Sequence, residues 1–160
     1  MKIYIVRHGH SPSAKDAGVA ADFDRPLSEE GKAAAFKAGL TIKESGKIPE
    51  IIFHSPLKRA HQTALQINSA LNCSEGIKSF EPLANLLTAP ELLNEIAPWV
   101  KRYEALVLVG HQPQLGDMIY FLCGKNIGLQ PAQVVAIELN STQNLEASFL
   151  WSSDFLGRQV

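Results

Sequence analysis

Residues 1–10 read MKIYIVRHGH, and this stretch decides the fold. Residues 3–6 form a β-branched and aromatic run without strict alternation, which predicts a strand buried on both faces, as in a parallel sheet. The strand stops at Arg7, His8 and Gly9. Open α/β sheets form their ligand crevice at the carboxyl ends of their strands, so these three residues stand where a functional site is expected.

The three residues after this strand suit the binding of an oxyanion. Gly9 allows a sharp turn and lets a ligand come close to the backbone, so we place it in the binding site. His8 offers a nitrogen nucleophile, and Arg7 offers a planar, permanent positive charge. The same tripeptide also fits a strand that merely leaves the core through polar residues, so its interpretation depends on the rest of the chain.

The length and composition are those of one compact globular domain over residues 1–160. With 46% hydrophobic residues and a net charge of −1, the chain has no overall attraction to nucleic acid or to an anionic membrane. Cys73 and Cys123 form no CxxC pair, which is typical of reduced thiols. We see no signal-peptide pattern and no apolar run of membrane-spanning length, so we expect a cytoplasmic protein.

Strand and helix patterns alternate along the chain. Short apolar runs predict strands at residues 51–53, 77–80 and 105–109. Strands at 133–139 and 145–151 are expected to pair antiparallel through a turn at 140–144. The expected helices cover about residues 29–44, 56–71, 89–101 and 115–123. We therefore predict an α/β fold: a single three-layer domain with a mainly parallel sheet, helices on both faces and an antiparallel C-terminal strand.

Local signals predict how the helices begin and which faces they bury. Ser28 is a good N-cap, and Thr88 with Glu91 forms a capping-box pattern. Ser55 is expected to cap the second helix, with Pro56 at its first position. The expected buried face of the first helix consists of Ala33, Phe36 and Leu40.

Four charged or titratable side chains, far apart in the sequence, are expected to meet at one edge of the sheet, because the carboxyl ends of parallel strands share that edge. They are Arg7, His8, Arg59 and His111. Thr63, one turn after Arg59, could support it. Such a pocket suits a phosphoryl group, whose oxygens match arginine in bidentate fashion. We expect no metal and no cofactor, because no acidic ligand cluster has suitable spacing.

Three other polar side chains near this edge have less certain roles. Arg25 precedes the first helix and is either a surface residue paired with Asp22 or Asp24, or a group that faces the substrate. His61 is expected at the surface. His54 is expected to be a hydrogen-bonded residue at a strand end rather than a catalytic one.

The motifs together resemble the histidine phosphatase superfamily. They are residues 7–9 (RHG) at a strand end, residues 55–64 (SPLKRAHQTA) and residues 110–111 (GH), and they span the chain in the family's order. Residues 25–27 (RPL) and Pro113 are most similar to its short branch, the phosphohistidine phosphatases. The resemblance implies a phosphoglycerate mutase-like fold.

The resemblance also implies roles for the candidate residues. His8 would be the nucleophile that becomes phosphorylated, and water would then hydrolyse the phosphorylated His8. Arg7 and Arg59 would hold the phosphoryl oxygens. His111 would complete the pocket and stabilise the transferring group. Arg25 resembles an additional substrate-binding arginine of the short branch.

The general acid of the family is the point where this sequence departs from the pattern. Larger members that resemble phosphoglycerate mutases carry a clear acid, whereas Glu81 is the acid found here after the third strand, and a solvated loop residue explains it equally well. A phosphate ester needs a proton donor, but a protonated phosphoramidate leaves without one. This difference favours phosphohistidine as the substrate.

Three functions therefore compete. The preferred one is a metal-independent phosphatase that acts on protein phosphohistidine through a phosphohistidine enzyme intermediate. The alternatives are a phosphatase or mutase for small phosphate esters and a non-catalytic phospho-ligand binding module. Residues 11–27 and 83–88 are the long connections expected at the functional edge, which leaves a shallow, open pocket. We expect a monomer whose partner is a phosphorylated protein.

Overall fold

One mixed sheet forms the centre of the computed structural model, which describes residues 1–141, 146–154 and 157–160. Its strands are β1 (Lys2–Arg7), β2 (Ile51–His54), β3 (Ile77–Ser79), β4 (Ala105–Gly110), β5 (Val134–Ser141) and β6 (Glu146–Ser152), in the spatial order β3-β2-β4-β1-β5-β6. β1 to β4 are parallel, β5 runs antiparallel to β1, and β6 runs antiparallel to β5. The predicted fold class is confirmed.

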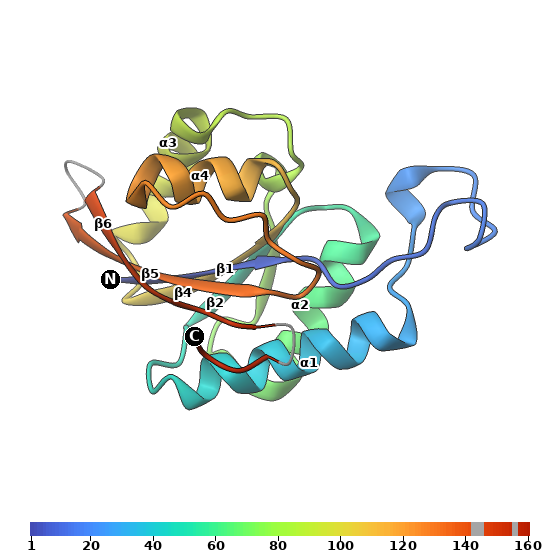
Figure 1. Ribbon diagram of the computed structural model, residues 1–160, viewed down its shortest axis with the longest axis horizontal. Coiled ribbons are helices and arrows are strands. Elements are labelled where there is room, and N and C mark those ends of the chain that lie inside the picture. The colour runs from blue at the N-terminus through green and yellow to red at the C-terminus, as the bar shows by residue number, and fades with distance from the viewer. Residues whose placement is uncertain (142–145, 155–156) are drawn as a thin grey trace.

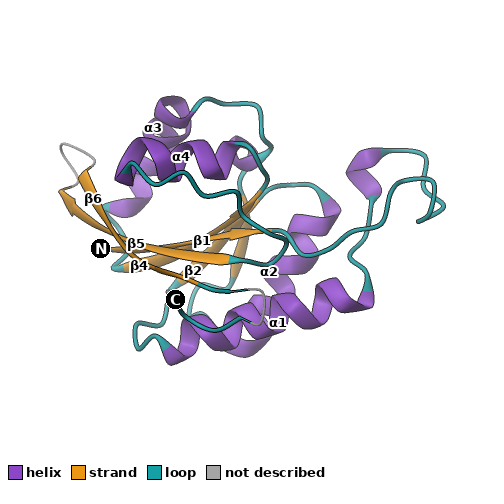
Figure 2. Cartoon of the chain, in the orientation of Figure 1, coloured by secondary structure: helices purple, strands orange, loops and turns teal. Residues whose placement is uncertain are grey.

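Helices cover both faces of the sheet (Figure 1). α1 (Glu29–Glu44) and α2 (Lys58–Leu71) lie on one face, and α3 (Ala89–Val100) and α4 (Gln114–Cys123) lie on the other. Figure 2 shows the long loop between β1 and α1, which extends beyond the sheet and holds the short helix η1 (Asp22–Asp24). No helix in the described part of the chain is long and apolar enough to cross a membrane.

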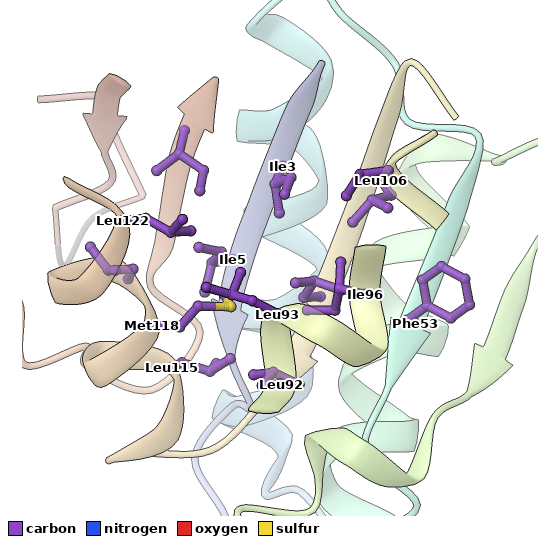
Figure 3. Packing of buried hydrophobic residues seen from close by; sticks show 14 of the residues in the cluster. Ile3, Ile5, Phe53, Leu92, Leu93, Ile96, Leu106, Leu115, Met118 and Leu122 are labelled. Atoms are coloured by element: carbon purple, nitrogen blue, oxygen red, sulfur yellow. The ribbon is translucent and has the colours of Figure 1, made fainter. Parts of the chain in front are cut away.

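The alternation of side chains along β1 supplies two separate hydrophobic cores. Ile3 and Ile5 pack with α3 and α4, as Figure 3 shows, whereas Tyr4 and Val6 pack with α1 and α2. All four side chains are fully buried. Since both faces of β1 are covered, its functional residues can reach solvent only beyond the end of the strand, which is where Arg7 and His8 stand.

The buried face of α1 differs from the predicted one. Ala33, Phe36 and Leu40 are exposed. The face that packs inward consists mostly of small residues, namely Gly31, Ala35, Ala38, Gly39, Thr41 and Ile42. A Cβ atom built on Gly39 would lie 2.8 Å from Ala70 Cβ and 2.8 Å from Ile67 O, so α1 and α2 approach too closely for larger side chains. Close helix packing, rather than side-chain hydrophobicity, therefore decides the orientation of α1.

Two of the predicted helix starts are confirmed and one is wrong. Ser28 accepts a hydrogen bond from Gly31 N, and the capping box of Thr88 and Glu91 is present. Ser55 does not cap α2, which begins three residues later at Lys58. The hydroxyl of Ser55 is instead used inside the candidate site. The turn predicted at residues 140–144 lies largely outside the described residues.

Candidate active site

Two neighbouring strand ends bring two histidines together. Arg7, the last residue of β1, is the register partner of Gly110, the last residue of β4. His8 and His111 follow directly, and their ring centroids are 5.1 Å apart. Arg59, in the first turn of α2, reaches the same cavity of about 290 Å³, which Arg7, His8 and His111 also line. The structure thus brings the four principal candidate residues together.

The backbone around Gly9 orients the ring of His8. His8 Nδ1 lies 2.7 Å from Gly9 O, and because a carbonyl oxygen only accepts, Nδ1 carries the hydrogen. Nε2 therefore keeps its lone pair. Gly9 N donates to Thr63 Oγ1 at 3.0 Å, and Thr63 Oγ1 donates to the carbonyl of Arg59 at 2.7 Å. One buried threonine thus ties the turn after β1 to the start of α2.

Gly9 itself is required by the close packing of this turn. A Cβ atom built on Gly9 would lie 2.6 Å from the carbonyl oxygen of Gly31, in the first turn of α1. No other residue type lacks that atom, so the turn can approach α1 only with glycine at this position.

Both pocket histidines are held in the neutral state. Burial lowers the pKa of His8 to about 4, and the charges of Arg59, Arg7 and Arg25 act in the same direction, against the raising effect of the bond to Gly9. Burial and then the neighbouring His8 lower the pKa of His111 to about 3. A neutral imidazole is the form that can act as a nucleophile, so His8 is available for attack near neutral pH.

A serine that sequence reasoning assigned to a helix cap holds His111. His111 Nε2 lies 2.7 Å from Ser55 Oγ, which also accepts a hydrogen bond from Leu57 N at 3.3 Å. The Ser55 hydroxyl has a second lone pair as well as one hydrogen, so it can pair with either tautomer of the neutral His111 ring. The sequence signal that could have found this contact is the position of Ser55, directly after a strand that neighbours β4.

The guanidinium groups of Arg7 and Arg59 each make hydrogen bonds through some nitrogen atoms, but their Nε atoms have no partner among the described residues. Arg7 Nη1 donates to the carbonyl of Leu129 at 2.8 Å, across 122 residues of sequence. The Nε atoms of Arg7 and Arg59 are buried and have no hydrogen-bond partner among the described residues. A buried donor without an acceptor is costly, so both guanidinium groups are held in place at some cost in stability.

A carboxylate, that of Asp22, lies against Arg59 and Arg25; its pairing with Arg25 is one of the sequence-based interpretations, but its contact with Arg59 is not. Arg59 donates to Asp22 O at 2.9 Å and to Asp22 Oδ2 at 3.1 Å, and Arg25 Nη1 lies 2.8 Å from Asp22 Oδ1. Hydrogen bonding to Arg25 and the charge of Arg59 lower the pKa of Asp22. Asp22 therefore carries a negative charge in the mouth of the pocket, where it would compete with an incoming anion for Arg59.

Arg25 makes the surface pairing that was one of its two interpretations. Besides Asp22, it donates through Nε to Pro12 O at 2.7 Å and through Nη2 to Ser11 O at 2.9 Å. These contacts hold the loop before α1 together. Its charge still contributes to the lowered pKa of His8, so Arg25 lies near enough to act on the pocket electrostatically. A direct contact between Arg25 and substrate stays a prediction.

Other polar candidates lie apart from the cavity. Glu81 is exposed in the short helix η2 (Glu81–Leu83), and it is not among the described residues that line the cavity with His8. His54 is buried, with Nδ1 2.8 Å from Ser55 O, and its Nε2 lies 3.3 Å from Nδ1 of the exposed His61. Within the described ranges, no group of three or more His, Cys, Asp or Glu side chains is placed to hold a metal ion.

The family comparison agrees with the motifs in the sequence. Residues 3–84 match the model of the histidine phosphatase superfamily (branch 1). An uncharacterized protein of Picosynechococcus sp. is 33% identical over 146 residues, which cover 86% of this chain and 84% of that protein. A 2,3-bisphosphoglycerate-dependent phosphoglycerate mutase of Bifidobacterium longum is 38% identical over 74 residues, which cover 46% of this chain but 29% of the mutase.

The fold is shared with a solved structure over nearly its whole length. The protein histidine phosphatase SixA, solved in complex with tungstate, superposes with a TM-score of 0.82 at 20% identity, covering 95% of this chain and 96% of that one. At this level of identity the likeness concerns the arrangement of helices and strands.

Proposed function

The chain belongs to the histidine phosphatase superfamily, and from that membership we propose that it removes phosphoryl groups through a covalent intermediate on His8. The observation that carries the proposal is the hydrogen bond from His8 Nδ1 to Gly9 O. It leaves Nε2 as a neutral nucleophile in a cavity lined by two arginines.

Each step of the proposed reaction uses groups of this pocket. His8 Nε2 attacks phosphorus, and the bond to the leaving group breaks with its electron pair going to that group. Arg7, Arg59 and His111 contact the phosphoryl oxygens, whose charge must be stabilised in the transition state. A water molecule then attacks phosphorus, the bond to His8 Nε2 breaks, and inorganic phosphate leaves.

Protein phosphohistidine is the substrate class that the proposal favours. Asp22 is the carboxylate in the pocket mouth, and its lowered pKa makes it a poor proton donor. A phosphohistidine whose ring already carries a proton needs no such donor, because its imidazole leaves without further help. An alkyl phosphate needs a donor to protonate its leaving oxygen. A phosphohistidine side chain on a protein surface could also enter an open pocket directly.

Small phosphate esters form the second candidate class. The similarity to the phosphoglycerate mutase, 38% over 74 residues, supports it. Turnover of protein phosphohistidine, free phosphohistidine, 3-phosphoglycerate and a sugar phosphate should be measured side by side. We expect kcat/KM to be at least about tenfold higher for phosphohistidine, which is ~1.4 kcal/mol of transition-state binding. Equal or better turnover of 3-phosphoglycerate would establish the second class instead.

The nucleophile is tested with two histidine variants. His8→Ala should lower kcat by at least about 10³-fold, because the covalent route is lost. The matched control is His10→Ala, which removes a neighbouring exposed histidine and should leave the rate near that of the unchanged protein. Rapid quenching should trap acid-labile, base-stable phosphate on the unchanged protein and none on His8→Ala. Full activity in His8→Ala would exclude the mechanism.

A further inference from the structure

One large apolar side chain at the cavity is almost fully in solvent. Leu86 is 86% exposed, the highest value among the large hydrophobic side chains of the described residues. It nevertheless lines the same cavity as His8 and Arg59. An exposed leucine is ordinary by itself, but a leucine held at the mouth of a charged pocket is not explained by packing.

The loop that carries Leu86 is held by hydrogen bonds to one buried glutamine, Gln114. Asn85 N donates to Gln114 Oε1 at 3.2 Å, and Gln114 N donates to Asn85 Oδ1 at 3.1 Å. Gln114 Nε2 also donates to Pro82 O at 3.0 Å and to Leu87 O at 3.2 Å. Gln114 is 3% exposed, so the side chain that anchors the loop before and after Leu86 is itself buried.

The backbone before Leu86 is also in an unusual conformation. Asn85 has a φ of 69°, in the left-handed region that most residues avoid. Asparagine tolerates this region better than most, and here its side chain and its backbone N–H both bond to Gln114. The loop therefore fixes the backbone at Leu86, so the entropy of ordering that backbone is already lost before a ligand binds.

The position of Leu86 relates it to the leaving group rather than to the phosphoryl group. Arg7, Arg59 and His111 form the charged part of the cavity, where the phosphoryl oxygens would lie. The group that carries the phosphate must then extend past the remaining lining residues, of which Leu57, Ala84 and Leu86 are apolar. An apolar contact favours a ring or hydrocarbon group there over one that is covered with hydroxyl and carboxylate groups.

We propose that Leu86 determines specificity by contacting the body of the leaving group, so that the site selects phosphoryl groups attached to a flat ring. The imidazole of a phosphohistidine side chain is such a ring. The proposal rests on the proposed function, because a leaving group exists only if the protein is a phosphatase. The binding preference that it predicts can be measured with ligands that do not react.

The test compares two inert phosphonates that differ in the group attached to phosphorus, with inorganic phosphate as the reference. Dissociation constants for phenylphosphonate, methylphosphonate and inorganic phosphate are measured by calorimetry. The unchanged protein should bind phenylphosphonate more tightly than methylphosphonate. Leu86→Ser should remove about tenfold of that preference and should change the affinity for inorganic phosphate less than about twofold. Leu86→Met, which restores an apolar side chain of similar volume, should recover the preference.

A matched control removes another exposed apolar side chain. Ile48 is 41% exposed and precedes β2, at the opposite edge of the sheet from the cavity, so Ile48→Ser should leave all three constants unchanged. An unchanged ring preference in Leu86→Ser, or an equal loss of affinity for all three ligands, would overturn the proposal. Failure of the proposed function would show differently, as ring-selective binding without any turnover.

Discussion

Thr63 connects the turn that carries His8 to the start of α2, which carries Arg59, although Thr63 itself does not line the cavity. Its Oγ1 accepts from Gly9 N, beside the nucleophile His8, and donates to the carbonyl of Arg59. The expectation that it supports Arg59 is met through the backbone, not through the guanidinium. Its side chain is fully buried, so no water replaces either bond.

Replacing Thr63 by valine should therefore affect both stability and rate. Thr63→Val keeps the shape but leaves Gly9 N–H without an acceptor, which costs about 1–3 kcal/mol. We expect kcat to fall at least about tenfold, because the turn that orients His8 loosens. Thr63→Ser retains the hydroxyl and should keep most of the rate. Urea unfolding and steady-state kinetics measure the two effects, and an unchanged kcat in Thr63→Val would show that the turn needs no such support.

At the scale of elements, α1 is positioned by how closely it can approach α2. Its exposed Phe36 and Leu40 are more hydrophobic than the small residues that it buries. Burial of those two side chains would have been favourable. The inward face is nevertheless the one that contains Gly39, because Ala70 and Ile67 leave no space for a side chain there.

Gly39→Ala separates close packing from helix propensity, because the two effects change the free energy of unfolding in opposite directions. Alanine is favoured over glycine in a helix by about 1 kcal/mol. The added Cβ would lie 2.8 Å from Ala70 Cβ and from Ile67 O, and overpacking of this kind costs about 1–3 kcal/mol. We expect a net loss of stability in urea unfolding. Ala33→Gly, on the exposed side, measures the propensity contribution alone, and a more stable Gly39→Ala protein would show that the helices separate easily.

For the whole molecule, the buried histidines link the active site to stability. The pKa values of His8, about 4, and His111, about 3, lie below the ordinary histidine value of 6.5, chiefly because of burial. The unfolded chain therefore binds protons at a higher pH than the folded one. The stabilisation by these groups is fully present above about pH 6.5 and is lost as the pH falls toward their folded pKa values.

We therefore expect the free energy of unfolding to decrease between about pH 6.5 and pH 4. The measurement is the urea midpoint as a function of pH. A double variant with His8→Gln and His111→Gln should show a flatter profile over this range, because its two side chains do not titrate. Identical profiles for the two proteins would mean that other groups cause the acid sensitivity.

Much of the fold and of the site could be predicted from the sequence, because the signals were local. The buried run before Arg7 and the capping box at Thr88 each depend on residues within one or two turns of chain, and the structure confirms both elements. Parallel strand order then placed His8 and His111 at one edge, since parallel strands end on the same side, and Arg59 lies there at the start of α2.

The partners of these residues were decided by the tertiary structure alone. Arg7 bonds to Leu129 across 122 residues, His111 to Ser55 across 56, and Arg59 to Asp22 across 37. No local pattern encodes such pairs. A hydrogen bond forms wherever packing brings a donor within about 3 Å of an acceptor, and that distance is set by the whole sheet and its helices rather than by neighbours in the chain. The sequence by itself determined that Arg7, His8, Arg59 and His111 reach the pocket. The packing determined which of their atoms stay free and which further side chains, such as Asp22, join them.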